Sequence, residues 1–379
     1  MINENILKLE LSGIRKMFEM AGEDTINLGL GQPDFQPPED VIEVYKRSML
    51  DGNNGYGSSY GLPDLREEIA KCQSRHRSDL TMDNVMITVG ATQALRITLE
   101  STVGKGDEVL YPEPGFVLYE PQISLTGGQA VPYPVLQQND FVPTIDKLEE
   151  LRTPSTKAII VNSPGNPTGG VFTKNDVEEI TSWAQEHDML IISDEVYEMM
   201  VYEDEHVSFL GDYDNVIAIN SFSKTFAMTG WRIGFMVTGQ EWIRQIGKLH
   251  YYTIACPPTP PQHAVLYALK DRLDFVDEMT ETFRRRRDVI VERLNGIEGI
   301  DCLNPRGAFY AFPTFEYDLS SQEFAMALLK KGVIATPGDA FGPTGEGHIR
   351  FSYANSTENI IKAMDILEET VREIYPSSP

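Results

Sequence analysis

The stretch Asn-Ser-Phe-Ser-Lys-Thr-Phe-Ala-Met-Thr-Gly-Trp-Arg-Ile-Gly, residues 220–234, is flanked by two apolar runs at residues 216–219 and 233–237. Such short apolar runs predict buried strands, with Lys224 in the loop between them. A desolvated lysine has a lowered pKa and can serve as a nucleophilic amine. Nearby hydroxyl and guanidinium groups are of the kind that bind a phosphate ester, namely Ser221, Ser223, Thr225 and Arg232. A lone loop lysine more often points to water, so this stretch alone leaves both interpretations open.

Two further strand ends carry groups that can bind a ligand. A predicted strand at residues 85–89 turns directly into a helix at Gly90-Ala91-Thr92, where backbone N–H groups can bind an anion. Another predicted strand, residues 189–193, ends at Asp194, and open α/β sheets bind ligands at this end of their strands. A turn without phosphate and a helix-capping aspartate are the structural alternatives.

Two loops and one strand complete the set of motifs. Residues 162–169, Asn-Ser-Pro-Gly-Asn-Pro-Thr-Gly, predict a tight, fixed loop, and we expect a cis peptide bond before Pro167. Residues 27–35 contain a Gly-Gln-Pro-Asp-Phe turn. Arg350 alternates with apolar residues in a predicted strand, where it either pairs with an acidic residue or binds a ligand carboxylate.

The composition narrows the range of functions. The 379 residues include 57 acidic and 32 basic ones, a net charge of −25, which argues against nucleic-acid binding. An anionic substrate would therefore need a local positive site. Three separated cysteines predict no disulfide framework and favour a reducing, cytoplasmic location. No apolar run has the length of a membrane span, and no histidine pair has metal-ligand spacing, so we expect neither a membrane segment nor a metal site.

Two helical segments lie near the ends of the chain. Residues 4–22 predict an irregular, partly helical N-terminal arm. Residues 269–294 predict one long or broken helix that contains four successive arginines, Arg284 to Arg287. Because successive residues spread around a helix, we expect these arginines on a solvated surface with acidic partners.

The lysine segment, the loop at 162–169 and the turn at 31–35 resemble those of the class I/II aminotransferases, and the resemblance follows the family's order across nearly the whole chain. These are fold-type I enzymes that use pyridoxal 5'-phosphate (PLP). The resemblance implies an α/β fold with a large PLP-binding domain at residues 41–275, built on a mostly parallel seven-stranded sheet. The N-terminal arm, residues 1–40, and residues 276–379 would form a smaller α+β domain.

The resemblance also implies a role for individual residues. Lys224 would be joined to the cofactor and act as general base, while Asp194 would bind the pyridine nitrogen and Tyr197 with Asn166 the phenolic oxygen. Phe116 would stack on the ring and border the substrate. The phosphate would be held by Gly90, Ala91, Thr92, Ser221, Ser223, Arg232 and, across a homodimer interface, Tyr56 of the other subunit. The substrate carboxylate would contact Gly31, Asn166 and Arg350.

The implied reaction moves an amino group from an L-amino acid to a 2-oxo acid such as 2-oxoglutarate. The donor would be aspartate or an aromatic amino acid, although Thr92 stands where some aspartate-specific relatives carry a lysine. A carbon–sulfur β-lyase or related synthase of the same fold is the alternative. A transcription regulator would need a DNA-binding module before Gly31, where we expect none. A nucleotide-dependent enzyme lacks support because no complete GxGxxG or P-loop sequence is present.

Overall fold

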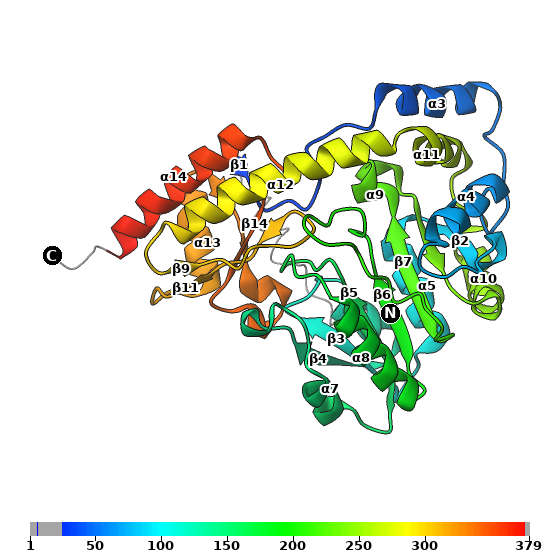
Figure 1. Cartoon of the computed structure of the whole chain (residues 1–379), viewed down its shortest axis with the longest axis horizontal. Coiled ribbons are helices and arrows are strands. Elements are labelled where there is room, and N and C mark those ends of the chain that lie inside the picture. The colour runs from blue at the N-terminus through cyan, green and yellow to red at the C-terminus, as the bar shows by residue number, and fades with distance from the viewer. Residues whose placement is uncertain (1–5, 7–24, 376–379) are drawn as a thin grey trace.

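A seven-stranded sheet forms the centre of the computed structural model, which describes residue 6 and residues 25–375 (Figure 1). Apart from Ile6, the predicted N-terminal arm lies outside the described residues. The sheet is parallel except for β8, which runs antiparallel to both of its neighbours. In sheet order the strands are β2 (Val85–Thr88), β8 (Gly234–Val237), β7 (Val216–Ser221), β6 (Leu190–Asp194), β5 (Thr156–Asn162), β3 (Glu108–Glu113) and β4 (Gln129–Pro134).

Helices cover both faces of this sheet, which explains why its central strands are apolar without alternation. In β5, Ile159 and Val161 pack into the core on one face, while Ala158 and Ile160 pack into the core on the other. The first core includes side chains of α3 (Glu39–Leu50), α4 (Pro63–Gln73), α8 (Lys174–Glu186) and α11 (Thr259–Asp271). The second includes side chains of α5 (Gly90–Thr102), α6 (Tyr119–Thr126) and α10 (Gln240–Ile254). Two short helices complete this part, α7 (Ile145–Leu151) and α9 (Phe222–Thr225).

The remaining elements enclose a separate core. Three helices contribute to it, namely α12 (Leu273–Asn295), α13 (Ser321–Lys330) and α14 (Thr357–Ile374). The short strands are β1 (Ile26–Asn27), β9 (Ile300–Asp301), β10 (Tyr310–Ala311), β11 (Thr314–Phe315), β12 (Val333–Ile334), β13 (Thr336–Pro337) and β14 (Ile349–Ser352). The long helix α12 extends from the sheet domain along this second part, and its Phe275 packs against both cores (Figure 1). The predicted domain limits at residues 41 and 275 stay a prediction.

The helix predicted over residues 269–294 is broken at Arg272, which lies between α11 and α12. The expectation that Arg284 to Arg287 form a solvated surface is wrong for two of the four. Arg286 and Arg287 are buried because this side of α12 packs against other segments of the chain, where they pair with Asp34 and Glu203. Arg284 is exposed and pairs with Glu281 on the same helix.

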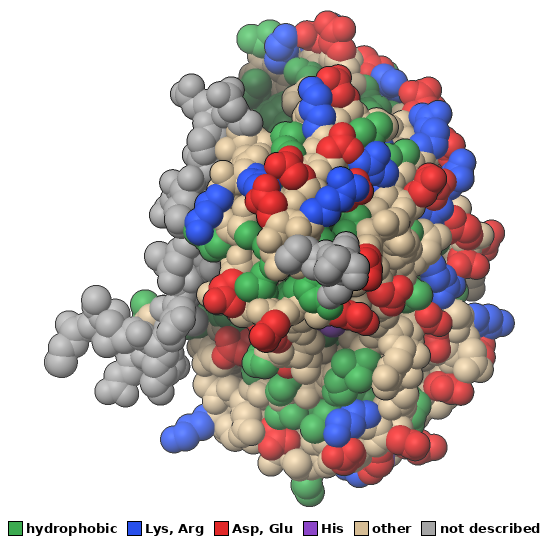
Figure 2. All heavy atoms as spheres, turned by 90° about the vertical axis from the view of Figure 1, so that its left-hand side faces the viewer, with side chains coloured by type: hydrophobic (Ala, Val, Ile, Leu, Met, Phe, Trp, Pro, Cys, Tyr) green, Lys and Arg blue, Asp and Glu red, His purple; other side chains and the backbone are tan. Residues whose placement is uncertain are grey.

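The surface carries charges of both signs. Figure 2 shows acidic and basic side chains interspersed over one face, without a large basic region. None of the helices in the described part of the chain combines the length and the apolar composition that crossing a membrane requires.

Candidate active site

A cavity of about 330 Å³ opens where β5, β6 and β7 end, a size typical of small-molecule sites. Its walls come from the sheet domain and from the part of the chain that encloses the separate core with α12, α13 and α14. Twelve of the residues predicted for the site line it: Gly31, Ala91, Thr92, Phe116, Asn166, Asp194, Tyr197, Ser221, Ser223, Lys224, Arg232 and Arg350. The structure therefore brings together side chains that are separated by up to about 320 positions in the sequence.

One end of the cavity offers donors suited to an anion. The first turn of α5 points N–H groups that have no intrahelical partner toward it. Gly90 has φ +73° there, and a Cβ on this residue would lie 2.4 Å from Arg232 Nη2, so only glycine admits the guanidinium. The hydroxyls of Ser221 and Ser223 lie 2.8 Å apart at the same end. Among the described residues, no carboxylate forms an ion pair with Arg232, which donates to the Thr229 carbonyl.

Lys224 projects into the cavity from α9, the single turn that follows β7. Its ammonium donates to the carbonyl oxygen of Gly31. The pKa of Lys224 is lowered to about 8, chiefly by burial and also by the charges of Arg350 and Arg232, while Asp194 acts in the opposite direction. A substantial fraction of this amine is therefore neutral at mildly alkaline pH, as a nucleophile or a base requires.

Asp194, at the end of β6, is the carboxylate that lines the cavity. Burial raises its pKa to about 6, although the Tyr119 hydroxyl donates a hydrogen bond of 2.8 Å to Oδ2 and lowers it. The Val196 backbone N–H lies 3.4 Å from Oδ1. Asn162 fixes the backbone by donating from Nδ2 to the Asp194 carbonyl at 2.9 Å. This carboxylate would gain stability from a protonated ring nitrogen, since no arginine or lysine forms an ion pair with it in the described chain.

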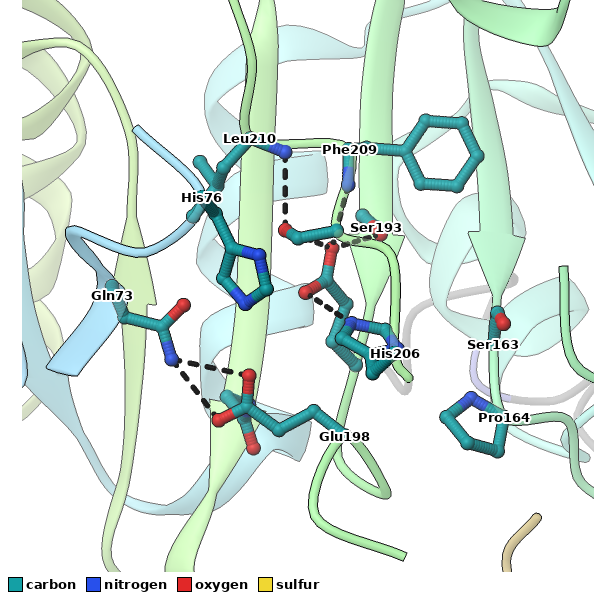
Figure 3. Close-up of polar contacts among 12 residues, drawn as sticks. Gln73, His76, Ser163, Pro164, Ser193, Glu198, His206, Phe209 and Leu210 are labelled. Carbon is teal, nitrogen blue, oxygen red and sulfur yellow. Dashed lines mark hydrogen bonds and ion pairs between the residues drawn. The ribbon is translucent and has the colours of Figure 1, made fainter. Parts of the chain in front are cut away.

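A polar cluster anchors the backbone just behind Asp194 (Figure 3). Glu195 is buried and accepts hydrogen bonds from Ser193, Ser208, the Phe209 N–H and His206. Burial would raise the pKa of Glu195, but the hydrogen bond and charge of His206 together with the hydrogen bonds from Ser193 and Ser208 outweigh it, and the pKa is lowered. Within the described residues, Glu195, Glu198 and His206 have ligand atoms within 4.8 Å of one another. Each carboxylate oxygen already accepts a hydrogen bond, those of Glu198 from Gln73 at 3.0 and 3.1 Å, so we interpret the cluster as an anchor.

Arg350, on β14, forms the opposite end of the cavity. It is buried, and it donates to Asn166 Oδ1 at 2.9 Å, to the Gly29 carbonyl at 2.5 Å and to Thr336 Oγ1 at 3.3 Å. Its Nε has no partner, and no acidic side chain among the described residues pairs with it. Burial accordingly lowers its pKa. The first of the two alternatives from the sequence, pairing with a structural acid, does not apply.

Aromatic side chains close the cavity around these charges. Tyr197 and Tyr310 exchange a hydrogen bond of 2.8 Å between their hydroxyls, and the Tyr310 ring lies 4.5 Å from the Arg350 guanidinium. Phe116 packs edge-on against Tyr119 with ring centroids 5.7 Å apart. The Tyr310 hydroxyl also excludes any side chain larger than glycine at position 31, where a Cβ would lie 2.3 Å away.

The structure also bears on the predicted cis peptide bond, on Tyr56 and on contacts that were not predicted. The peptide bond before Pro167 is cis, which confirms that prediction, and those before Pro114 and Pro164 are cis without having been predicted. Tyr56 is 93% exposed and lies outside the cavity of its own chain. Tyr119, Tyr310 and Asn162 contact site residues but were not predicted to do so, because only tertiary packing places them there.

Comparison with known proteins agrees with this geometry. The family described as aminotransferase class I and II matches residues 23–367. The chain belongs to this family. It is 42% identical over 96% of both chains to an aspartate aminotransferase of Pyrococcus abyssi. It is 40% identical over 98% of both chains to aromatic-amino-acid aminotransferase 2 of Thermococcus litoralis.

A solved structure supports the same assignment. The crystal structure of an aromatic aminotransferase from Pyrococcus horikoshii matches with a TM-score of 0.89 and 39% identity, over 95% of this chain and 99% of the other. The expected fold-type I architecture is thereby confirmed, and so is the expectation of an amino-acid aminotransferase. The alternative of a carbon–sulfur β-lyase finds no support among these relatives.

Proposed function

We propose that this aminotransferase uses PLP to move an amino group from an L-amino acid to a 2-oxo acid. The observation that carries the proposal is the cavity's excess of positive charge in a chain of net charge −25. Lys224, Arg232 and Arg350 line it, and neither arginine has an acidic partner among the described residues. Such an arrangement favours ligands that carry both a phosphate and a carboxylate.

The residues fit the cofactor by the chemistry of their donors. The first turn of α5, Arg232, Ser221 and Ser223 would hold the phosphate, and Asp194 would face the pyridine nitrogen. Tyr197 and Asn166 would face the phenolic oxygen, and Phe116 the ring. When bound, PLP supplies an aldehyde that joins to amines and a ring that accepts electron density.

The chain's own groups supply binding, orientation and proton transfer. Arg350 and Asn166 would hold the substrate carboxylate, with the bidentate guanidinium fixing its direction. The Lys224 amine, neutral above a pKa of about 8, would take the α-proton of the amino acid. Asp194, ionised above its pKa of about 6, would favour a protonated ring nitrogen. Aspartate and aromatic amino acids are the proposed donors, because relatives with those names resemble the chain at about 40% identity.

We extend the proposal to a homodimer in which Tyr56 of each subunit reaches the partner's phosphate site. Its support is the exposure of large aromatic side chains, 93% for Tyr56 and 85% for Tyr252. Such residues are enriched at interfaces between proteins. Static light scattering of the purified protein tests the dimer. The cytoplasmic location stays a prediction.

The decisive experiment combines a spectrum with an amino-donor panel. We expect the purified protein to bind PLP with visible absorption, and to form glutamate when 2-oxoglutarate is supplied with aspartate, phenylalanine or tyrosine. No amino transfer from any of the common L-amino acids would overturn the proposal. Release of pyruvate and ammonia from cystathionine without an added 2-oxo acid would do so as well.

A further inference from the structure

Residues 29–31 form the wall of the cavity beside Lys224 and Arg350, and the chain continues from them to Asp34 and Phe35, which contact α12. The Gly29 carbonyl accepts from Arg350 and the Gly31 carbonyl from Lys224. Leu30, between them, lines the cavity. Any displacement of this wall would therefore change the surroundings of both cations at once.

The two ends of this wall are held differently. The Gly29 and Leu30 N–H groups donate to Asn27 Oδ1, and Thr336 Oγ1 donates to the Gly29 carbonyl, so residues 29 and 30 are fixed beside β1. Within the described residues, the backbone of residues 31–37 makes one hydrogen bond, the one that Gly31 accepts from Lys224. The segment must therefore be fixed by its side chains. Gly31 itself has none, whereas Asp34 and Phe35 both contact α12.

Arg286 on α12 provides the fixed point. Its guanidinium binds Asp34 through two hydrogen bonds of 2.7 and 3.0 Å, a bidentate geometry that restricts direction as well as distance. The same guanidinium lies 5.5 Å from the Phe35 ring and 5.7 Å from the Phe283 ring. Phe35 in turn packs edge-on against Phe283 with centroids 5.5 Å apart. The side chain of Arg286 is 11% exposed and that of Asp34 is 31% exposed, so water screens this pair less than it screens a fully exposed one.

We infer that Arg286 is a positioning residue: by holding Asp34 it sets the place of the Gly31 carbonyl, and thereby orients Lys224 for the substrate. Arg286 does not line the cavity and acts through the wall. The phosphate end, built from α5, Ser221, Ser223 and Arg232, does not contact this wall through any hydrogen bond of the described residues. Substrate binding should therefore suffer more than cofactor retention when the pair is broken.

The test compares Arg286→Met with Arg284→Met, a matched control two residues earlier on the same helix. Arg284 is exposed and pairs with Glu281 and Asp288, and surface pairs of this kind contribute little. The kinetic comparison of these variants rests on the proposed function. We expect Arg286→Met to raise the KM for the amino donor about tenfold, with a smaller change in kcat, since small misplacements of binding groups are costly. Arg286→Lys should recover part of the loss, and Arg284→Met should behave as the wild type.

A second readout needs no cofactor and no turnover. In the cofactor-free protein, the rate at which an amine-acylating reagent modifies Lys224 is measured by mass spectrometry of its peptide. A displaced wall should raise this rate several-fold in Arg286→Met but not in Arg284→Met. If Arg286→Met does not fold, Asp34→Asn breaks the same pair from the other side. The Asp34→Asn/Arg286→Met double variant should be no worse than either single variant.

The outcomes separate this inference from the proposed function. An inactive wild type would contradict the proposed function and leave the reactivity of Lys224 as the deciding measurement. Equal KM and equal Lys224 reactivity in Arg286→Met and Arg284→Met would overturn the inference, and so would a change in only one of the two. Additive effects of Asp34→Asn and Arg286→Met would overturn it too.

Discussion

Arg287 and Arg350 are buried to the same degree, each with 3% of its surface exposed, yet their surroundings differ. Arg287, on α12, pairs with Glu203 and Asp288 at 2.6 Å each. Burial tends to lower its pKa, but the hydrogen bonds to these carboxylates outweigh it and the pKa is raised. Arg350 faces neutral carbonyl, amide and hydroxyl oxygens, and its pKa is lowered.

The difference supports the proposed role of Arg350 in binding a ligand and a structural role for Arg287. Burying an ion without a countercharge has a desolvation free energy on the order of several kcal/mol. Evolved sequences tolerate such a conflict mainly where function requires it. Arg350 meets that description in the cavity, whereas Arg287 stabilises the packing of α12. The following predictions test this contrast from the largest expected effect to the smallest.

Replacing Lys224 with alanine should have the largest effect. We expect kcat to fall by at least about 10⁴-fold, as when an essential catalytic group is removed, and the visible absorption of the PLP-loaded protein to be lost. Lys248→Ala is a suitable control, because this exposed lysine on α10 donates to Gln245 and does not line the cavity. Initial rates with saturating donor provide the measurement. Normal turnover by Lys224→Ala would exclude the site altogether.

Methionine substitutions of the two equally buried arginines compare them directly. Arg350→Met should lower kcat/KM by about 10²–10³-fold, the cost of losing a buried carboxylate contact. The same change also removes a buried charge without a countercharge, which offsets the hydrogen bond that Asn166 loses, so the cofactor-free protein should lose less stability in urea unfolding than Arg287→Met does. Arg287→Met should affect stability more than catalysis. It should retain most activity but unfold about 1–3 kcal/mol more easily, since Glu203 and the Pro305 carbonyl lose a donor.

If both substitutions lower stability equally, the contrast between the two arginines fails. If Arg287→Met lowers kcat/KM as much as Arg350→Met, α12 takes part in substrate binding directly. Either result is readable from one set of unfolding curves and one set of rates.

Asp194 and Glu195 extend the contrast to adjacent carboxylates. The pKa of Asp194 is raised to about 6, from an ordinary value of 3.8, so the folded cofactor-free protein binds more protons than the unfolded chain between those pH values. Stability due to this group therefore falls as pH rises from 3.8 to 6, and the full cost remains above pH 6. Asp194→Asn should accordingly be more stable than the wild type above pH 6, by about 2–3 kcal/mol, with the gain vanishing near pH 4.

Glu195→Gln should lower stability at neutral pH, the opposite of the change expected for Asp194→Asn. The pKa of Glu195 is lowered, despite burial, by the hydrogen bond from His206, so its charge stabilises the fold at neutral pH. Thermal unfolding of both variants across pH 4–8 checks the two signs together. A destabilised Asp194→Asn at pH 7 would contradict the view that Asp194 awaits a cationic partner.

The sequence predicted local features of this molecule better than long-range ones. Apolar runs without alternation indicated strands covered on both faces, and dense proline and glycine indicated the fixed loop at 162–169. These features depend on neighbouring residues, so the pattern itself contains the information. That Lys224 and Asp194 meet was implied by the resemblance to a known family and not by local pattern, and the two residues do line one cavity.

Burial of individual polar side chains could not be predicted in the same way. Four successive arginines look alike on a helix, yet Arg286 and Arg287 are buried because of the segments that pack on them, and Arg284 is not. Tyr310 reaches Arg350 only because β10 pairs with β14. Such contacts join residues far apart in the chain, and no local periodicity marks them.

Tyr119 is the residue of this kind with the smallest but most specific predicted effect. It is fully buried on α6, and its hydroxyl is the one side-chain donor to Asp194 among the described residues. Tyr119→Phe keeps the ring and removes this donor, so the pKa of Asp194 should rise further and its hold on a ring proton should weaken. We expect kcat to fall about tenfold, the equivalent of one buried hydrogen bond to a charged group.

Tyr133 offers the matched control for that change. It is equally buried, and its hydroxyl donates to the Ile160 carbonyl at 2.7 Å, away from Asp194. Tyr133→Phe should cost comparable stability in urea unfolding while kcat stays near the wild-type value. If the two variants lose activity equally, the loss reflects general packing. A loss of activity in Tyr119→Phe alone would point to the contact with Asp194. A carboxyl with a raised pKa ionises only at a higher pH, so the pH profile of kcat in this variant should also shift to a higher pH. Both results together would show that the Tyr119 hydroxyl determines the charge of Asp194.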